Sequence, residues 1–149
     1  MAMRTILAAV LLACTALPAR AAGEKFGAGV VLGVPFGLTA KYWLGARDAV
    51  QAHAGISDGD LTMSADYLVN FDKVLPRKVA GARMPLYAGL GLKIKTESET
   101  FFGIRFVAGV SMFHSTRPFE FFAEVAPVLR VAPRSGAALD GAVGFRRYF

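Results

Sequence analysis

The sequence predicts an all-β protein, an eight-stranded antiparallel up-and-down transmembrane β-barrel after an N-terminal signal peptide. Hydrophobic residues make up 54% of the 149 residues, but the longest predominantly apolar run, residues 6–17, is too short for a membrane-spanning helix of about 20 residues. Downstream of that run, apolar and polar residues alternate in eight segments separated by turn residues. The last segment, residues 139–149, ends on an aromatic residue, and an exposed apolar strand of this kind is suited to a closed barrel in lipid.

The N-terminus has the three parts of a secretory signal peptide. Arg4 is followed by the apolar run and then by the small-x-small sequence Ala19-Arg20-Ala21. We therefore expect residues 1–21 to be removed before Ala22, leaving residues 22–149 as one barrel domain without cysteine. A second possibility is left open, since Leu11-Leu12-Ala13-Cys14 loosely resembles a lipoprotein box and would lipidate Cys14.

The charge of the chain limits its partners. The formal net charge is +6, and removal of Arg4 and Arg20 lowers it by two. The basic residues alternate with carboxylates, and they form no basic face with interleaved aromatic residues. The composition therefore argues against nucleic-acid binding, whereas a basic surface is compatible with anionic lipid headgroups.

The first four strands are expected at residues 25–32, 38–44, 49–56 and 61–70. In each of them one parity is apolar, as in Val50, Ala52 and Ala54, and the other parity holds polar or small residues. Gly and Pro mark the turn at residues 33–37, and Ser57-Asp58-Gly59-Asp60 is a strong hairpin pattern.

The last four strands are expected at residues 86–95, 101–113, 119–131 and 139–149. Polar loops at residues 96–100, 114–118 and 132–136 connect them, and residues 71–83 form the longest connector. Pro127 falls inside the seventh strand, where it cannot donate a backbone hydrogen bond, so we expect a bulge or a break in the ladder there.

The parity of the charged residues decides the class of barrel. Large aliphatic residues occupy one parity of all eight segments, and charges fall almost entirely on the other, which is also rich in glycine and alanine. Such a narrow polar face fits the interior of an eight-stranded barrel. We expect a lumen charge network of Lys41, His53, Asp66, Lys93, Arg105, Glu120, Glu124, Arg130, Asp140 and Arg146.

This network is interpreted first as structural, because charges in a narrow lumen must pair. A gated or proton-sensing path with His53 as the titrating group is an alternative. The even strand number places both termini, and with them the connector at residues 71–83, on the periplasmic side. That connector carries Lys73, Arg77, Lys78 and Arg83 and is a candidate surface for a partner.

Four segments resemble an uncharacterised family of short bacterial outer-membrane β-barrel proteins, which is similar in architecture to the OmpA transmembrane domain and OmpX. They are residues 29–44 (GVVLGVPFGLTAKYWL), 65–68 (ADYL), 85–91 (PLYAGLG) and 124–127 (EVAP). The resemblance covers essentially the whole mature chain. It implies an eight-stranded antiparallel barrel and brings no enzyme activity or cofactor with it. We also expect an outer-membrane location, contact with outer-membrane lipid, and a monomer.

The same resemblance implies that the C-terminal residues are an insertion signal. Phe145, Tyr148 and Phe149 would be read by the barrel-assembly machinery during insertion. Members of the family usually end in Tyr-Tyr-Phe, and this chain departs from that pattern at Arg147.

Residues suited to catalysis do not form a recognisable motif. His53 with Ser57, and His114-Ser115 with Glu120 or Glu124, supply the residue types used by lipid-modifying barrel enzymes, but neither spacing gives their His-x-Ser arrangement. No metal-ligand spacing occurs. We therefore expect no catalytic, metal or cofactor site, and a lipid-modifying enzyme is the lesser alternative.

The expected function is that of a small outer-membrane β-barrel with a structural or surface-interaction role. The main alternative is a soluble or lipid-tethered periplasmic barrel, lipocalin-like, that binds an apolar ligand. The two differ in the direction of the apolar face. If Phe102, Ile104 and Phe106 point into a cavity, the binding barrel is favoured.

Overall fold

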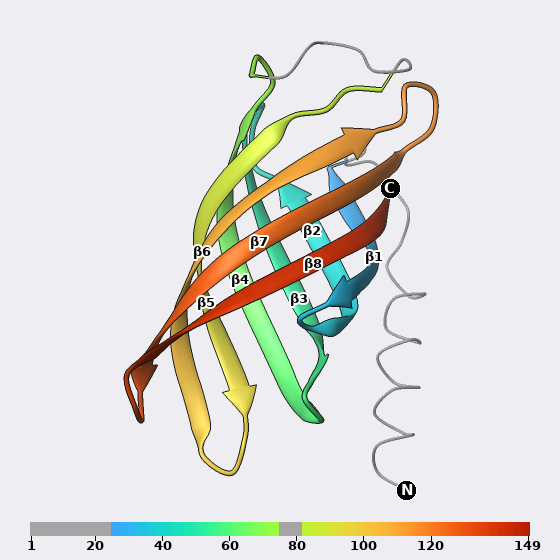
Figure 1. Ribbon diagram of the computed structural model, residues 1–149. Coiled ribbons are helices and arrows are strands. Elements are labelled where there is room, and N and C mark those ends of the chain that lie inside the picture. The colour runs from blue at the N-terminus through green and yellow to red at the C-terminus, as the bar shows by residue number, and fades with distance from the viewer. Residues whose placement is uncertain (1–24, 75–81) are drawn as a thin grey trace, which may run out of the picture.

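A computed structural model describes residues 25–74 and 82–149, which form a closed barrel of eight antiparallel strands (Figure 1). Each strand pairs with its neighbours in sequence, and β1 pairs with β8 to close the barrel. The predicted all-β, eight-stranded, up-and-down architecture is therefore confirmed. The strands are β1 (Phe26–Gly33), β2 (Phe36–Trp43), β3 (Asp48–Ser57), β4 (Asp60–Phe71), β5 (Leu86–Thr96), β6 (Thr100–Phe113), β7 (Phe119–Ala132) and β8 (Gly136–Tyr148).

Several predictions concern residues outside the described ranges. The signal peptide at residues 1–21, the candidate lipidation site Cys14, and Arg77 and Lys78 of the basic connector all lie there. Within the described ranges, no helix has the length and hydrophobicity that a membrane crossing would require.

The two ends of the barrel differ in their connections. One end, here called the terminal end, carries the ends of β1 and β8 that lead to the two termini, together with the β2–β3, β4–β5 and β6–β7 connections (Figure 1). The other end, here called the far end, carries the four remaining hairpin connections. The ends of β4 and β5 that the longest connector joins therefore lie at the terminal end.

The β3–β4 hairpin has the tight turn that its sequence predicts. Ser57 pairs with Asp60, and the two residues between them both have positive φ, 54° at Asp58 and 86° at Gly59. This combination is a type I′ turn, whose twist matches that of the flanking strands and which favours Asp-Gly.

The alternation along the strands separates an apolar outer wall from a polar interior. Leu92 and Leu139 are 65% and 70% exposed on the outside, and Phe102 and Phe106 are also exposed there. Most charged residues of the opposite parity, such as Arg105 and Glu120, are buried in the interior. The predicted parity of the faces is therefore correct.

Glycines on the inner face make room for large rings from the neighbouring strand. The cross-strand pairs are Tyr148 with Gly27, Tyr87 with Gly109, and Phe122 with Gly144. In each pair a Cβ on the glycine would lie within 3 Å of the ring, and at Gly144 the closest distance is 2.3 Å. The glycine content of the polar face is thus a packing requirement of a narrow barrel.

The β6–β7 seam is irregular, as Pro127 predicts. Pairing runs from Arg105 with Val128 to Ala108 with Val125 and leaves out the two positions between, one of which would pair with Pro127. A register shift between Phe102 and Gly103 adds a bulge further along the same seam. The expected ladder break at Pro127 is confirmed, and it follows from the missing backbone N–H.

Two strands begin at least two residues earlier than the sequence pattern indicates. β2 begins at Phe36 because Gly37 pairs with Gly55, although Gly37 was assigned to a turn. β8 begins at Gly136, where the backbone pairs with Arg130. Strand pairing is a property of the backbone, so it continues through small residues that show no side-chain alternation.

Candidate functional site: the charged lumen

The interior of the barrel holds the charge network predicted from the sequence. Of its ten predicted members, all except Arg130 are buried. Four cations and four carboxylates balance when His53 is neutral. They are Lys41, Lys93, Arg105 and Arg146 against Asp66, Glu120, Glu124 and Asp140.

Glu124 on β7 is the acceptor at the centre of the lumen. One of its oxygens, Oε1, accepts hydrogen bonds from Arg105 at 3.0 Å and lies 3.0 Å from Nε2 of His53. The other oxygen, Oε2, accepts from the Gln51 amide at 3.0 Å and from the Tyr87 hydroxyl at 2.8 Å. Both oxygens are therefore fully engaged, as a buried carboxylate requires.

Arg105 on β6 joins three carboxylates from three strands. Its Nε donates to Asp66 at 3.0 Å, its Nη2 to Glu124 at 3.0 Å, and its Nη1 to Asp140 at 3.3 Å. Lys93 donates to the same Asp140 oxygen at 2.6 Å. The planar guanidinium group suits this position because it offers several donors in fixed directions.

A second cluster surrounds Glu120, nearer to the terminal end. Glu120 accepts hydrogen bonds from Lys41 at 3.1 Å, Arg146 at 3.2 Å and the Tyr148 hydroxyl at 2.6 Å, and also from the Ser111 hydroxyl. Arg146 in turn donates to Oε1 of Gln51 at 2.9 Å. Since the Gln51 amide donates to Glu124, Gln51 connects the two clusters.

Aromatic rings cover this network at the terminal end. The ring of Phe113 lies 6.1 Å from that of Trp43 and 6.0 Å from that of Tyr148, measured between centroids. The Lys41 ammonium lies 4.6 Å from the centroid of the Trp43 ring, a cation–π distance. The rings therefore stand between the buried Lys41–Glu120 pair and the mouth of the barrel.

At the far end, Lys95 is surrounded by carboxylates. It pairs with Asp58 at 3.0 Å and with Glu97 at 3.1 Å. The hydrogen bond and the positive charge of Lys95 lower the pKa of the Asp58 carboxyl below its ordinary value. Arg130, predicted as a member of the lumen network, lies at this end, with its guanidinium 4.2 Å from the Phe101 ring and 3.5 Å from Glu97.

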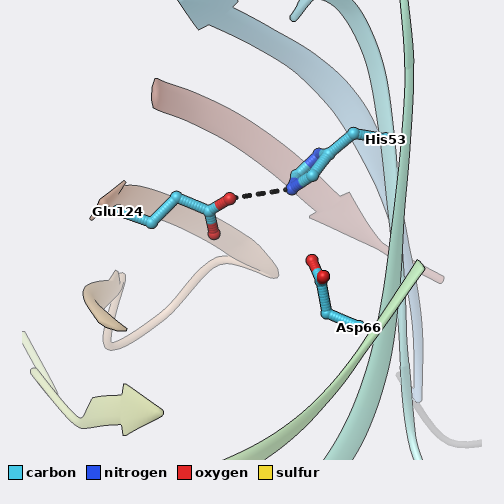
Figure 2. Close-up of side chains that lie close together, drawn as sticks. All are labelled: His53, Asp66 and Glu124. Atoms are coloured by element: carbon cyan, nitrogen blue, oxygen red, sulfur yellow. Dashed lines mark hydrogen bonds and ion pairs between the residues drawn. The ribbon is translucent and has the colours of Figure 1, made fainter. Parts of the chain in front are cut away.

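His53, Asp66 and Glu124 converge from β3, β4 and β7, as Figure 2 shows, and their ligand atoms lie within 4.8 Å of one another. A histidine and two carboxylates are suitable metal ligands. Both oxygens of each carboxylate, however, already accept hydrogen bonds from Arg105 or Gln51. A divalent ion would have to compete with the Arg105 cation, so the geometry favours a salt-bridge network over a metal site.

Within the described part of the chain, no hydrogen bond joins His53 to Ser57, or His114 or Ser115 to Glu120 or Glu124, as the two candidate catalytic sets would require. His53 contacts Glu124, whereas Ser57 donates a hydrogen bond to Asp58 at the far end. His114 lies in the β6–β7 connection, where its Nδ1 accepts from the backbone N–H of Thr116 at 3.2 Å.

Several uncharged members of the network were missed at the sequence level. They all have inward parity, but they carry no charge that would distinguish them in the sequence from other inward-facing residues. Hydrogen bonds add Gln51, Thr39, Ser111, Tyr87 and Tyr148 to the predicted charges.

The three residues of the predicted C-terminal insertion signal have different surroundings. The Phe145 ring lies on the outer wall, 5.2 Å from Phe119 and 5.1 Å from Phe121. Tyr148 points into the barrel, and Phe149 is exposed. Their role in insertion stays a prediction.

Comparisons with protein-family models, with characterised proteins and with solved structures found no significant match. The resemblance to the short bacterial outer-membrane barrels therefore stays a prediction.

Proposed function

We propose that this chain is a small outer-membrane β-barrel with a structural or surface-interaction role, a closed lumen and no catalytic activity. The observation that carries the proposal is the orientation of its two faces. Large apolar side chains are exposed around the barrel, and the charged residues are buried and paired inside.

The outer wall supports a lipid environment. Exposed apolar residues occur on every strand, including Val30, Tyr42, Val50, Leu61, Leu92, Phe106, Phe121 and Val143. Monomeric soluble proteins rarely expose contiguous apolar patches larger than a few hundred Å². In a bilayer the same wall is favourable, and strand-to-strand hydrogen bonding around a closed barrel satisfies the backbone.

The interior supports a structural role for the lumen over transport. Buried ion pairs join side chains from different strands at two levels of the lumen, one around Glu120 and one around Glu124. An ion or solute could pass only by breaking them. A barrel of eight strands is just wide enough for side chains to fill it, which agrees with this packing.

The lipocalin-like alternative requires an apolar cavity, and the relevant side chains do not supply one. Phe102 and Phe106 are 49% and 46% exposed on the outer wall, and the inward parity of the same strand carries Arg105 and Ser111. The charged lumen is the opposite of what an apolar ligand needs.

Cell fractionation followed by gel mobility of unboiled and boiled protein tests the proposal. We expect recovery with the outer membrane and a heat-dependent mobility shift, because a closed barrel in lipid resists detergent until it is heated. Recovery in the soluble periplasm without a shift would contradict the proposal.

A partner, if the role is interaction, would meet the terminal end on the periplasmic side. The connector there carries Lys73 and Arg83, and the sequence adds Arg77 and Lys78. Neutralising these four charges should change the set of proteins that crosslink to the barrel. An unchanged crosslinking pattern would exclude this surface.

A further inference from the structure

A polar cavity of about 340 Å³ opens at the terminal end, above the aromatic rings that cover the lumen. We call it the terminal vestibule. Arg83, His114 and Arg117 line it together with Trp43, Phe113 and Phe119, and none of the described residues in its lining carries a carboxylate side chain. A cavity with cationic and aromatic walls and no acidic group is suited to an anion.

The Arg83 side chain is held in place at the edge of the vestibule. Its Nε donates to Asp72 at 3.0 Å, and its guanidinium lies 5.2 Å from the centroid of the Phe113 ring. Within the described ranges, its two Nη atoms have no hydrogen-bond partner, and Arg117 forms no ion pair. Both guanidinium groups can therefore donate to an oxyanion, for which their geometry is well suited.

His114 supplies a third donor. Because its Nδ1 accepts a hydrogen bond from the backbone N–H of Thr116, the proton of the neutral ring lies on Nε2. That N–H adds to the guanidinium donors of the lining.

The charge of the two barrel ends agrees with this assignment. At the terminal end the described carboxylates are those of Asp48, Asp72 and the C-terminus at Phe149. They are outnumbered by the basic side chains of Lys25, Arg47, Lys73, Arg83, Arg117 and Arg147. The far end is nearly balanced, with Asp58, Asp60, Glu97 and Glu99 against Lys95, Arg130 and Arg134. An anion is therefore attracted to the vestibule end.

An aromatic strip leads from the vestibule onto the outer wall. Phe119 is part of the lining, its ring lies 5.2 Å from Phe145, and Phe145 lies 5.1 Å from Phe121. This strip offers an apolar surface directly below the cationic cavity.

We propose that the terminal vestibule binds the headgroup of an anionic phospholipid, with its acyl chains along the strip of Phe119, Phe121 and Phe145. Arg83, Arg117 and Nε2–H of His114 would donate to the phosphate oxygens, and the remaining volume of the cavity would hold the rest of the headgroup. An anion with an apolar tail fits the adjoining cationic and aromatic surfaces better than a small soluble anion does. The inference depends on the proposed membrane location.

Native mass spectrometry of the barrel in detergent, with equimolar phosphatidylglycerol and phosphatidylcholine, tests this inference. The wild-type barrel should retain phosphatidylglycerol preferentially. The double variant Arg83→Gln/Arg117→Gln should bind it about thirtyfold more weakly, since each basic residue near a lipid surface contributes about 1 kcal/mol. The matched control Arg130→Gln/Arg134→Gln removes the same charge at the far end and should retain the preference.

Three results would overturn the inference. They are equal retention of the two lipids by the wild type, an unchanged preference in the vestibule variant, and an equal loss in the far-end control. Soluble glycerol 3-phosphate separates the two sources of the phosphate group. It should not displace the lipid, and displacement at equal concentration would exclude the role of the aromatic strip.

A heat-dependent mobility shift of every variant confirms that each one is folded. Insertion into vesicles of phosphatidylcholine alone tests the membrane location without the anionic lipid. A barrel that inserts but shows no lipid preference contradicts only the vestibule assignment, whereas failure to insert contradicts the proposed function.

Discussion

Replacing Arg105 by methionine removes the cation that joins three buried carboxylates while keeping a side chain of moderate length. Asp140 keeps its ion pair with Lys93, and Glu124 keeps its contacts with His53, Gln51 and Tyr87. Asp66 keeps only the amide hydrogen bond from Gln51. The lumen then holds four carboxylates against three cations.

The expected cost follows from the burial of these groups. The Arg105 and Asp66 side chains are 1% and 0% exposed, so water cannot replace the lost contacts. Removing one partner of a buried ion pair typically costs about 3–5 kcal/mol, since the remaining charge is buried without compensation. We expect the free energy of unfolding to fall by an amount in this range.

Urea unfolding of the barrel in lipid vesicles measures this change. Trp43 is the single tryptophan of the chain and lies at the mouth of the lumen, so its fluorescence reports the folded interior. Arg134→Met, in the β7–β8 connection at the far end, is the matched control and should change stability by at most about 0.5 kcal/mol.

The double variant Arg105→Met/Asp66→Asn separates the effect of losing the Arg105–Asp66 ion pair on stability from the effect of the smaller side chain at position 105. It restores the balance of charge, so its cost should be smaller than the sum of the single costs by about 1–3 kcal/mol. An Arg105→Met barrel within about 1 kcal/mol of the wild type, or additive costs in the double variant, would refute the description of the lumen as a network of obligatory pairs.

Two further predictions address packing and charge. Gly144→Ala should destabilise the barrel by about 1–3 kcal/mol in the same unfolding assay, because its Cβ would lie 2.3 Å from the Phe122 ring. The control Gly141→Ala, whose Cβ meets nothing within 4 Å, should be close to neutral. Equal effects of the two substitutions would contradict the packing of rings over glycines. The Asp58 carboxyl has a lowered pKa because of Lys95, so its contribution to stability is present above the ordinary pKa of 3.8 and is lost as the pH falls through the lowered value. An NMR titration should place the midpoint of the Asp58 carboxyl below pH 3.8 and show that Lys95→Met raises it. A midpoint that does not change with this substitution would exclude the Asp58–Lys95 ion pair.

The sequence was sufficient to predict the number of strands and the direction of their faces. A period of two is a local property, so Gln51 and His53 could be placed inside and Val50 and Ala52 outside from neighbouring residues alone. The first residues of β2 and β8 could not be predicted from the alternation, because Gly37 and Gly136 continue the backbone pairing without a side-chain pattern.

The pairing inside the lumen could not be predicted in the same way. Lys41 and Glu120 are 79 positions apart and lie on β2 and β7, which are not adjacent in the barrel. Which inward residues meet across the lumen depends on the tilt and stagger of the strands, and these are set only when the barrel closes. Arg130, predicted as a member of the lumen network, pairs with Glu97 at the far end because it lies close to the end of β7.

Fluorescence quenching by brominated lipids can show whether the apolar outer wall of the barrel faces lipid. A tryptophan introduced by Leu92→Trp, in a Trp43→Phe background, occupies a wall position that is 65% exposed. We expect brominated acyl chains to quench this indole strongly and to quench Trp43 of the wild type weakly. Equal, weak quenching at both positions, with the barrel folded, would contradict a membrane-spanning barrel.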